Sequence, residues 1–319
     1  MLDLASARLT AVTGILVIAV GLGCHEASSV QPHPEPSVLP GADSARLSAA
    51  TASAVAPTPS AALSQVRRPR SAPCPSDMRL VDTACVDVYE AHLVRLGADG
   101  AWFPHSPYLR PEEGQRYAAR SAAGVTPQAY INRKEALAAC EAAGKRLCTI
   151  REWYRACTGS TGTVYPYGSQ FIAGRCNTGK PHLLSLLFGD DPRSWKYEEH
   201  FNNPRLNQEP GFLAATGAHP GCSSDAGTYD MVGNLHEWVS DAVDYDLVEK
   251  IPLRDDIRAK IGVNHGKAIF MGGFYSTTSQ HGRGCEFLTP GHGWKYHDYS
   301  TGFRCCRDPD SSAAVPPTP

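Results

Sequence analysis

Residues 132–159 read NRKEALAACEAAGKRLCTIREWYRACTG and contain two helix starts of the same kind. Asn132 is followed three residues later by Glu135, and Thr149 is followed three residues later by Glu152. In this capping-box pattern the two side chains satisfy backbone N–H groups that the first helical turn leaves free. A glycine follows each segment, and glycine commonly ends a helix. The stretch therefore predicts two short helices joined by a tight connection.

Outside this stretch, long periodic runs are few and turn residues are many. The 319 residues include 29 Gly and 25 Pro, and the sequence after residue 159 is rich in Gly, Pro and Asn turns. This pattern predicts a loop-rich α+β domain with the two helices early and short strands late. A fold so low in regular structure commonly needs covalent staples, and ten cysteines follow Cys24.

The composition is that of a globular protein, with 42% hydrophobic and 19% charged residues. The formal net charge is −2, and no long basic run or stripe occurs. Because binding to phosphates requires clustered Lys and Arg, we expect no nucleic-acid partner.

The first 24 residues resemble the export signal of a lipoprotein. Residues 11–22 form an apolar run that is too short to cross a bilayer as a helix, and Gly23-Cys24 follows it directly. We expect Cys24 to be lipidated, which makes the membrane a partner and places the protein in the cell envelope, periplasmic or at the surface. Plain secretion is the alternative. Both locations are oxidising and favour disulfides.

Two segments have compositions typical of disordered chain. Residues 25–72 are rich in Pro, Ala and Ser and lack aromatic residues, so they cannot bury enough apolar surface to fold. We interpret them as a tether, and residues 309–319 as a disordered tail of similar composition. The folded domain is then expected at residues 73–308.

Three motifs in order resemble the formylglycine-generating, or sulfatase-modifying factor, family. Residues 139–157 are similar to the family's C-x-x-x-G-K-R-L-P-T-E-x-E-W, with Cys148 where Pro is common. Residues 229–238 (YDMVGNLHEW) are similar to Y-[DN]-x-x-G-N-x-x-E-W, and the Gly-Gly at 272–273 with TGFRC at 301–305 is similar to the last motif. Residues 78–90 add a weaker match to the opening strand. The resemblance implies an α+β fold that is a disulfide-stapled variant of the C-type lectin fold.

The resemblance also implies two disulfides, Cys140–Cys305 and Cys157–Cys285. The first would close a loop of about 165 residues, which contributes about 5 kcal/mol in the chain-entropy model. The other six cysteines have no family counterpart, and their pairing stays open. Our tentative pairs are Cys74–Cys85, Cys148–Cys306 and Cys176–Cys222.

Copper-dependent members of the family use two cysteines, five residues apart, after the Gly-Gly. Their thiolates bind Cu(I), a soft metal ion, and oxidise a substrate cysteine to formylglycine. The matching positions here are Thr277 and Gly282. Neither residue supplies a thiolate, so we expect neither copper nor the classical formylglycine-generating activity.

Three histidines are candidates for binding a transition metal. His281, His292 and His297 lie in the same C-terminal segment and are candidates for a transition-metal or groove site, because imidazole binds iron, copper and zinc. Iron serves another branch of the superfamily, but no pattern in this sequence supports it. The alternative is that these are loop histidines that make ordinary hydrogen bonds.

For calcium, the resemblance implies a structural ion held by oxygen ligands in the second motif. The ligands would be the side chains of Asp230 and Glu237 and the backbone carbonyls of Gly233 and Leu235. Asn177 is a further candidate, in a second site. Alternatively, the two carboxylates simply cap turns.

Two functions follow from these patterns. The first is a binding or accessory module at the cell envelope that recognises a protein, peptide or glycan. The alternative is a metal-dependent oxidase, using non-heme iron or copper, or another protein-modifying enzyme of the same superfamily.

Overall fold

The computed structural model describes residues 73–278 and 282–310, which belong to one compact unit. The expected export signal with Cys24, the tether at 25–72 and most of the tail lie outside the described residues. No helix in the described part of the chain is long and apolar enough to cross a membrane.

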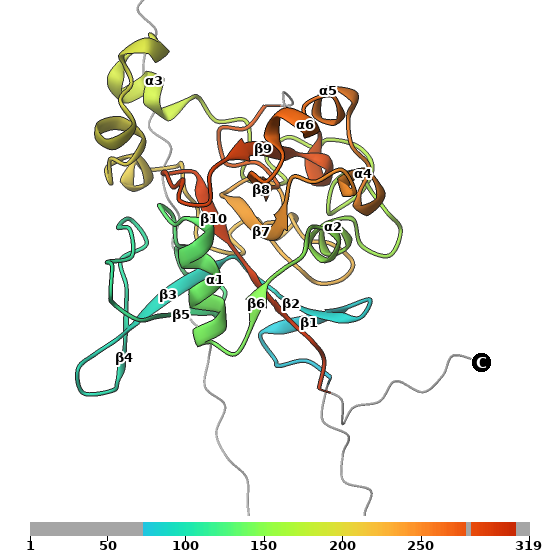
Figure 1. The fold of residues 1–319 in the computed structure, drawn as a ribbon, viewed down its shortest axis with the longest axis horizontal. Coiled ribbons are helices and arrows are strands. Elements are labelled where there is room, and N and C mark those ends of the chain that lie inside the picture. Colours follow the sequence, from blue (N-terminus) through green and yellow to red (C-terminus); the bar gives the residue numbers. More distant parts are fainter. Residues whose placement is uncertain (1–72, 279–281, 311–319) are drawn as a thin grey trace, which may run out of the picture. The chain divides into compact units, whose positions relative to one another are not determined.

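The strands form three small sheets (Figure 1). The first has the order β1-β2-β11-β6, all antiparallel. In the second, β10-β7-β8-β9, the β10–β7 pair is parallel and the others are antiparallel. The third is β4-β3-β5. The strands are β1 Met78–Val81, β2 Ala84–Asp87, β3 Ala91–Leu96, β4 Trp102–Pro104, β5 Tyr117–Ser121, β6 Arg146–Leu147, β7 His236–Ala242, β8 Ala268–Met271, β9 Leu288–His292, β10 Thr301–Phe303 and β11 Cys305–Arg307.

Both predicted helices are present with the predicted caps. In α1 (Arg133–Ala142), Asn132 accepts a hydrogen bond from the Glu135 N–H and the Glu135 carboxylate accepts one from the Asn132 N–H. In α2 (Ile150–Thr158), Thr149 and Glu152 make the same exchange. The remaining α-helices of the described residues are four to six residues long: α3 Leu183–Phe188, α4 Leu247–Lys250, α5 Asp255–Arg258 and α6 Ile261–Asn264. Short 3₁₀ or π turns are η1 Pro192–Ser194, η2 Tyr197–Phe201, η3 Leu206–Gln208 and η5 Gly284–Glu286.

The order of the elements differs from the prediction in one respect. Five strands, β1 to β5, precede α1, so strands are not confined to the later part of the domain. These strands are three to six residues long, and β2 is buried on both faces. A strand of this kind shows no alternation of apolar and polar residues, so period alone does not reveal it. The α+β class with little regular structure is confirmed.

Two tryptophans in the predicted motifs anchor the core. Trp153 on α2 and Trp238 on β7 are fully buried, in separate apolar clusters. Trp238 Nε1 donates to the Ile131 carbonyl over 2.9 Å, just before α1. The buried face of α1 consists largely of small side chains, Ala136, Ala139 and Cys140, which lets the helix lie close to β5 and β7.

Candidate functional site

A buried ion pair joins the second and third motifs. Arg304 lies between β10 and β11 and has no exposed surface. Its Nε donates to Glu237 Oε2 over 2.6 Å, and its Nη2 donates to Glu237 Oε1 over 2.7 Å. Trp153 Nε1 donates to the same Oε2 over 2.7 Å. The Glu237 carboxylate is therefore bound in the two-pronged geometry typical of strong Arg–carboxylate pairs.

Two more buried carboxylates lie in the field of Arg304. Glu90 accepts a 2.6 Å hydrogen bond from Asn234 Nδ2, and Asp230 Oδ2 accepts a 2.7 Å hydrogen bond from the Gly217 N–H. Burial raises the pKa of Glu90 well above its usual value and raises the pKa of Asp230 to about 6. Three carboxylates face one guanidinium, so the cluster favours an added proton or another positive charge.

One of the expected calcium ligands, Glu237, is bound by other side chains in this arrangement. Both Glu237 oxygens are engaged by Arg304 and Trp153, so a guanidinium stands where Glu237 would face the ion. Leu235 donates its backbone N–H to Glu90 over 3.0 Å. Gly233, at φ 82°, lies against the chain at Asn177: an added Cβ would be 2.1 Å from the Asn177 carbonyl oxygen. With both oxygens bound in this way, Glu237 has no oxygen turned to an open site in this structure, and calcium at the second motif stays a prediction.

Asn177 does fit as an oxygen donor. Its Nδ2 donates to the Phe212 carbonyl and to Asn234 Oδ1, each over 2.8 Å, which fixes the orientation of the amide. Its Oδ1 is buried and has no hydrogen-bond partner among the described residues. A buried acceptor without a donor costs about 1–3 kcal/mol. A cation or a water molecule at this oxygen would offset that cost.

The Gly-Gly segment turns sharply after β8 and ends at Thr277. Gly272 and Gly273 have φ of 83° and 76°, and a Cβ on Gly272 would lie 2.6 Å from the Met231 carbonyl oxygen. Thr277 Oγ1 accepts a 2.7 Å hydrogen bond from the Phe274 N–H. The Thr277 hydroxyl thus closes a turn of the backbone.

Gly282 has a conformation that excludes a side chain. Its φ is 125°, and an added Cβ would lie 2.5 Å from the Glu286 carbonyl oxygen. A cysteine at this position would require the backbone to move. The two positions at which the resemblance places copper ligands are therefore, in this structure, a turn-forming hydroxyl and a residue that must be glycine in this conformation.

The ten cysteines between residues 73 and 310 form five disulfides. The pairs are the two that the resemblance implied and the three that the sequence left tentative. Cys305 and Cys306 are neighbours on β11 and point to opposite faces of the strand, so one reaches α1 and the other the start of α2. The pairs are Cys74–Cys85, Cys140–Cys305, Cys148–Cys306, Cys157–Cys285 and Cys176–Cys222.

The histidine candidates do not converge within the described residues. His297 Nδ1 lies 2.6 Å from Asn202 Oδ1, and burial lowers the pKa of His297 to about 4. His292 packs against Phe270 and Tyr296, with ring centroids 5.2 Å and 4.0 Å away. His281 lies outside the described residues. In the part of the chain that the structure describes, no three His, Cys, Asp or Glu side chains come together to hold a metal.

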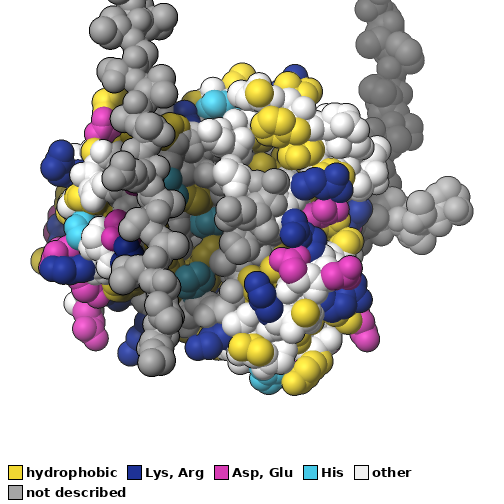
Figure 2. Space-filling view, turned by 90° about the horizontal axis from the view of Figure 1, so that it is seen from above, with side chains coloured by type: hydrophobic (Ala, Val, Ile, Leu, Met, Phe, Trp, Pro, Cys, Tyr) yellow, Lys and Arg dark blue, Asp and Glu magenta, His cyan; other side chains and the backbone are white. Residues whose placement is uncertain are grey.

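The face seen from above carries acidic and basic side chains in an interspersed pattern (Figure 2). Figure 2 also shows histidine side chains within a hollow of this face. His236, in the second motif, is one of the buried histidines, and its ring packs among Phe270, Phe274 and Phe287 with centroids 4.4–5.5 Å away.

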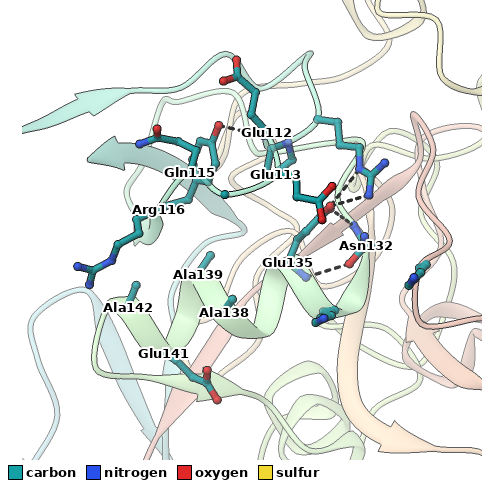
Figure 3. Close-up of a pocket in the computed structure, with 16 residues that line it drawn as sticks. Glu112, Glu113, Gln115, Arg116, Asn132, Glu135, Ala138, Ala139, Glu141 and Ala142 are labelled. Carbon is teal, nitrogen blue, oxygen red and sulfur yellow. Dashed lines mark hydrogen bonds and ion pairs between the residues drawn. The ribbon is translucent and has the colours of Figure 1, made fainter. Parts of the chain in front are cut away.

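A groove of about 770 Å³ runs between α1 and the loop of residues 110–117 (Figure 3). The exposed face of α1 forms one side with two small side chains, Ala138 and Ala142. At the start of α1, Arg110 forms an ion pair with Glu135 at 2.8 Å. Arg116, Lys134 and Lys295 add positive charge to the lining, whereas Glu112 points away from α1 and Glu141 points away from the loop.

Residues 86–309 match the sulfatase-modifying factor enzyme 1-like domain family. The chain belongs to this family. The match includes all three motifs and covers more than half of the sequence, which confirms the family expected from them and its C-type-lectin-like α+β fold.

Curated relatives of this sulfatase-modifying-factor domain include two proteins with the same name. The chain is 32% identical over 125 residues to "Inactive C-alpha-formylglycine-generating enzyme 2" of Bos taurus, covering 38% of this chain and 36% of that protein. It is 30% identical over 115 residues to the Mus musculus protein of that name, covering 36% of this chain and 32% of that one. The aligned region thus spans about a third of the length of these relatives.

Among solved structures, the domain is similar to PvdO from Pseudomonas aeruginosa. The sequences are 14% identical, the TM-score is 0.41, and the match covers 70% of this chain and 80% of PvdO.

The sequence did not predict two features of the sulfatase-modifying-factor domain, the buried cluster around Arg304 and the α1 groove. Arg304 and Glu90 both lie in quoted motifs, but their partners are distant in the chain. A basic residue in the middle of an apolar motif was the available signal, because a buried charge requires a partner. No sequence pattern indicated the α1 groove, since the groove depends on how the loop of residues 110–117 folds over the exposed alanines of α1.

Proposed function

We propose that this sulfatase-modifying-factor domain is a binding or accessory module at the cell envelope, without formylglycine-generating copper chemistry. The observation that carries the proposal is the state of the copper positions. Thr277 uses its hydroxyl to close a turn, and Gly282 has no room for a Cβ. The name "inactive" given to the bovine and mouse relatives supports the same conclusion.

The cysteines support it independently. Cu(I) at such a site needs thiolates, and each cysteine of the described residues is bonded to another. A Cys24→Ser full-length protein therefore should show no free thiol when denatured without reductant. It should also fail to bind Cu(I) in a competition titration with a chelator. A free thiol pair together with stoichiometric Cu(I) binding would overturn the proposal.

For the ligand, we favour a peptide that carries charges of both signs and binds in the α1 groove. The groove has a shallow apolar face at Ala138 and Ala142 and fixed charges at its edge, and such a combination provides both contact area and orientation. The groove volume of about 770 Å³ lies within the range usual for binding pockets.

The groove is tested by filling it. Peptides selected from a displayed library against the full-length protein should lose binding to Ala138→Trp, because the new side chain occupies the groove. Ala98→Trp is the matched control, since Ala98 is exposed in the connection between β3 and β4 and does not line the groove. Equal binding by both variants would show that the peptides bind elsewhere.

Calcium enters the proposal in a structural role, with Asn177 Oδ1 as one oxygen donor. We also propose that the N-terminal signal directs export and that a lipid on Cys24 attaches the protein to the membrane. Metabolic labelling with a radioactive fatty acid tests the attachment: the wild-type chain should be labelled and Cys24→Ser should not.

A further inference from the structure

A second cavity lies at the end of α2, apart from the α1 groove. Its volume is about 330 Å³, at the small end of the range for ligand pockets. Its lining is rich in hydroxyl groups, with three threonines and two serines. It also has one arginine, Arg175, one aspartate, Asp225, and one aromatic ring, Tyr167.

The two charged side chains present hydrogen-bonding groups that the protein leaves available. Arg175 Nε donates to the Gly221 carbonyl over 2.9 Å, and its guanidinium carbon lies 5.4 Å from the centre of the Tyr167 ring. Its two Nη atoms have no hydrogen-bond partner among the described residues. Asp225 is exposed and is held by the backbone N–H and the hydroxyl of Ser160, at 2.9 Å and 2.5 Å. The cavity thus has fixed donors and a fixed acceptor.

An apolar ledge adjoins this polar cavity. Tyr165 stacks on Tyr167 with centroids 5.6 Å apart and contacts Phe171 at 5.9 Å. Phe171 is 59% exposed and Ile172 is 49% exposed. The Ile172 N–H donates to the Tyr167 hydroxyl over 3.2 Å, which joins the ledge to the cavity wall. Exposed apolar side chains grouped beside a polar pocket are typical of a binding surface.

A disulfide holds the two walls in place. Arg175 directly precedes Cys176, and Ser223 directly follows Cys222, and these two cysteines are bonded to each other. The walls of the cavity are therefore tied across 46 residues of sequence. A ligand would meet groups that are already ordered, which lowers the entropic cost of binding.

We propose that this cavity binds a neutral saccharide. A sugar offers hydroxyls that each donate and accept, to satisfy Arg175 and Asp225 together, and a C–H face that packs on aromatic rings. An anionic ligand would pair with Arg175 but would be repelled by Asp225, and a purely apolar one would leave both charges unpaired. The inference rests on the proposed binding role and gives it a second ligand class at a separate site.

The test is a microarray of neutral mono- and oligosaccharides probed with the full-length protein, followed by isothermal titration of the strongest hit. Arg175→Ala and Phe171→Ala should each lower the affinity about tenfold or more, since charged hydrogen bonds or ring contacts are lost. Arg120→Ala is the matched control, because Arg120 also lies over an aromatic ring, Trp102 at 5.9 Å, and lines neither cavity. The control should bind as the wild type does.

Two outcomes would overturn the inference. One is the absence of binding to any neutral saccharide by a protein whose circular dichroism and melting temperature show it to be folded. The other is binding that Arg175→Ala and Phe171→Ala leave unchanged. Neither outcome bears on the copper positions or on peptide binding at α1, so failure here is distinguishable from failure of the proposed function.

Discussion

Arg304 neutralises Glu237 through two hydrogen bonds and lies in the field of Glu90 and Asp230. Replacing it with methionine keeps much of the packing volume but leaves the carboxylates without a counter-charge. We expect Arg304→Met to lower the free energy of unfolding by about 3–5 kcal/mol, measured by urea denaturation. The free energy of unfolding of Arg304→Lys should lie between those of the wild type and Arg304→Met, because lysine restores the charge but not the paired hydrogen bonds. A loss of less than about 1 kcal/mol in Arg304→Met would contradict this role.

Asp230 makes stability depend on pH in an unusual direction. Burial raises its pKa from 3.8 to about 6, so the folded state binds the proton more tightly than the unfolded state does. The contribution of Asp230 to the free energy of unfolding is therefore largest below about pH 4, falls as the pH rises to about 6, and then stays constant. Asp230→Asn should remove this fall, which amounts to as much as about 3 kcal/mol.

The measurement compares wild type and Asp230→Asn by urea unfolding at acidic and neutral pH. Groups outside the Arg304 cluster titrate equally in both proteins, so the difference between the two reports the titration of Asp230 together with that of Glu90, whose pKa the charge of Asp230 raises. A pH dependence that is the same in the two proteins would show that Asp230 is not perturbed by burial.

Asn177 provides the residue-scale test for calcium. If its buried Oδ1 is a donor to Ca²⁺, adding CaCl₂ should raise the melting temperature and EGTA should reverse the effect. Asn177→Ala should remove the difference between the two conditions, because the oxygen donor is lost. MgCl₂ serves as the control ion. Equal melting temperatures in CaCl₂ and EGTA would rule out a structural calcium.

At the scale of elements, two adjacent disulfides tie β11 to the helical region. Cys140–Cys305 and Cys148–Cys306 close loops of 165 and 158 residues, and these loops are nearly the same one. Cys157–Cys285 already closes a loop nested inside both. In the chain-entropy model the first closure therefore contributes about 4 kcal/mol, and the second, which closes a ring of about nine residues, contributes about 2–3 kcal/mol. The cost of about 5 kcal/mol expected for losing Cys140–Cys305 alone is therefore too high.

The prediction for these two disulfides is a non-additive pair. Replacing both cysteines of either disulfide with alanine should cost about 2–3 kcal/mol, whereas removing both disulfides, with Cys157–Cys285 intact, should cost about 6–7 kcal/mol. Guanidinium denaturation of the three variants measures the difference. A double variant that loses only the sum of the single losses would contradict the shared-loop account.

The elements also show what the sequence could predict. The caps of α1 and α2 are local signals that span three residues, and both were found with their partners. Of the five strands before α1, only an opening strand within residues 78–90 was expected. β2 is buried on both faces and shows no period, and β4 has three residues, too few to show one. The Arg304 cluster joins β7, α2 and the chain after β10, and no single segment contains that information.

At the scale of the whole molecule, the chain has the three motifs of the sulfatase-modifying-factor family, and the positions at which the resemblance places copper ligands make other contacts. In each position the replacement is consistent with its surroundings: Thr277 accepts a backbone hydrogen bond, and Gly282 approaches the Glu286 carbonyl. Such replacements fit a scaffold used for binding, because function depends on the site and not on the fold.

The most direct test of this account is an oxidation assay on a Cys-x-Pro-x-Arg peptide. The full-length protein, supplied with Cu(I) and oxygen, is incubated with the peptide, and an active copper-dependent member of the family serves as the positive control. Mass spectrometry should find the peptide cysteine unchanged after prolonged incubation with this protein and converted by the control enzyme. Formylglycine in the peptide after incubation with this protein would contradict this account.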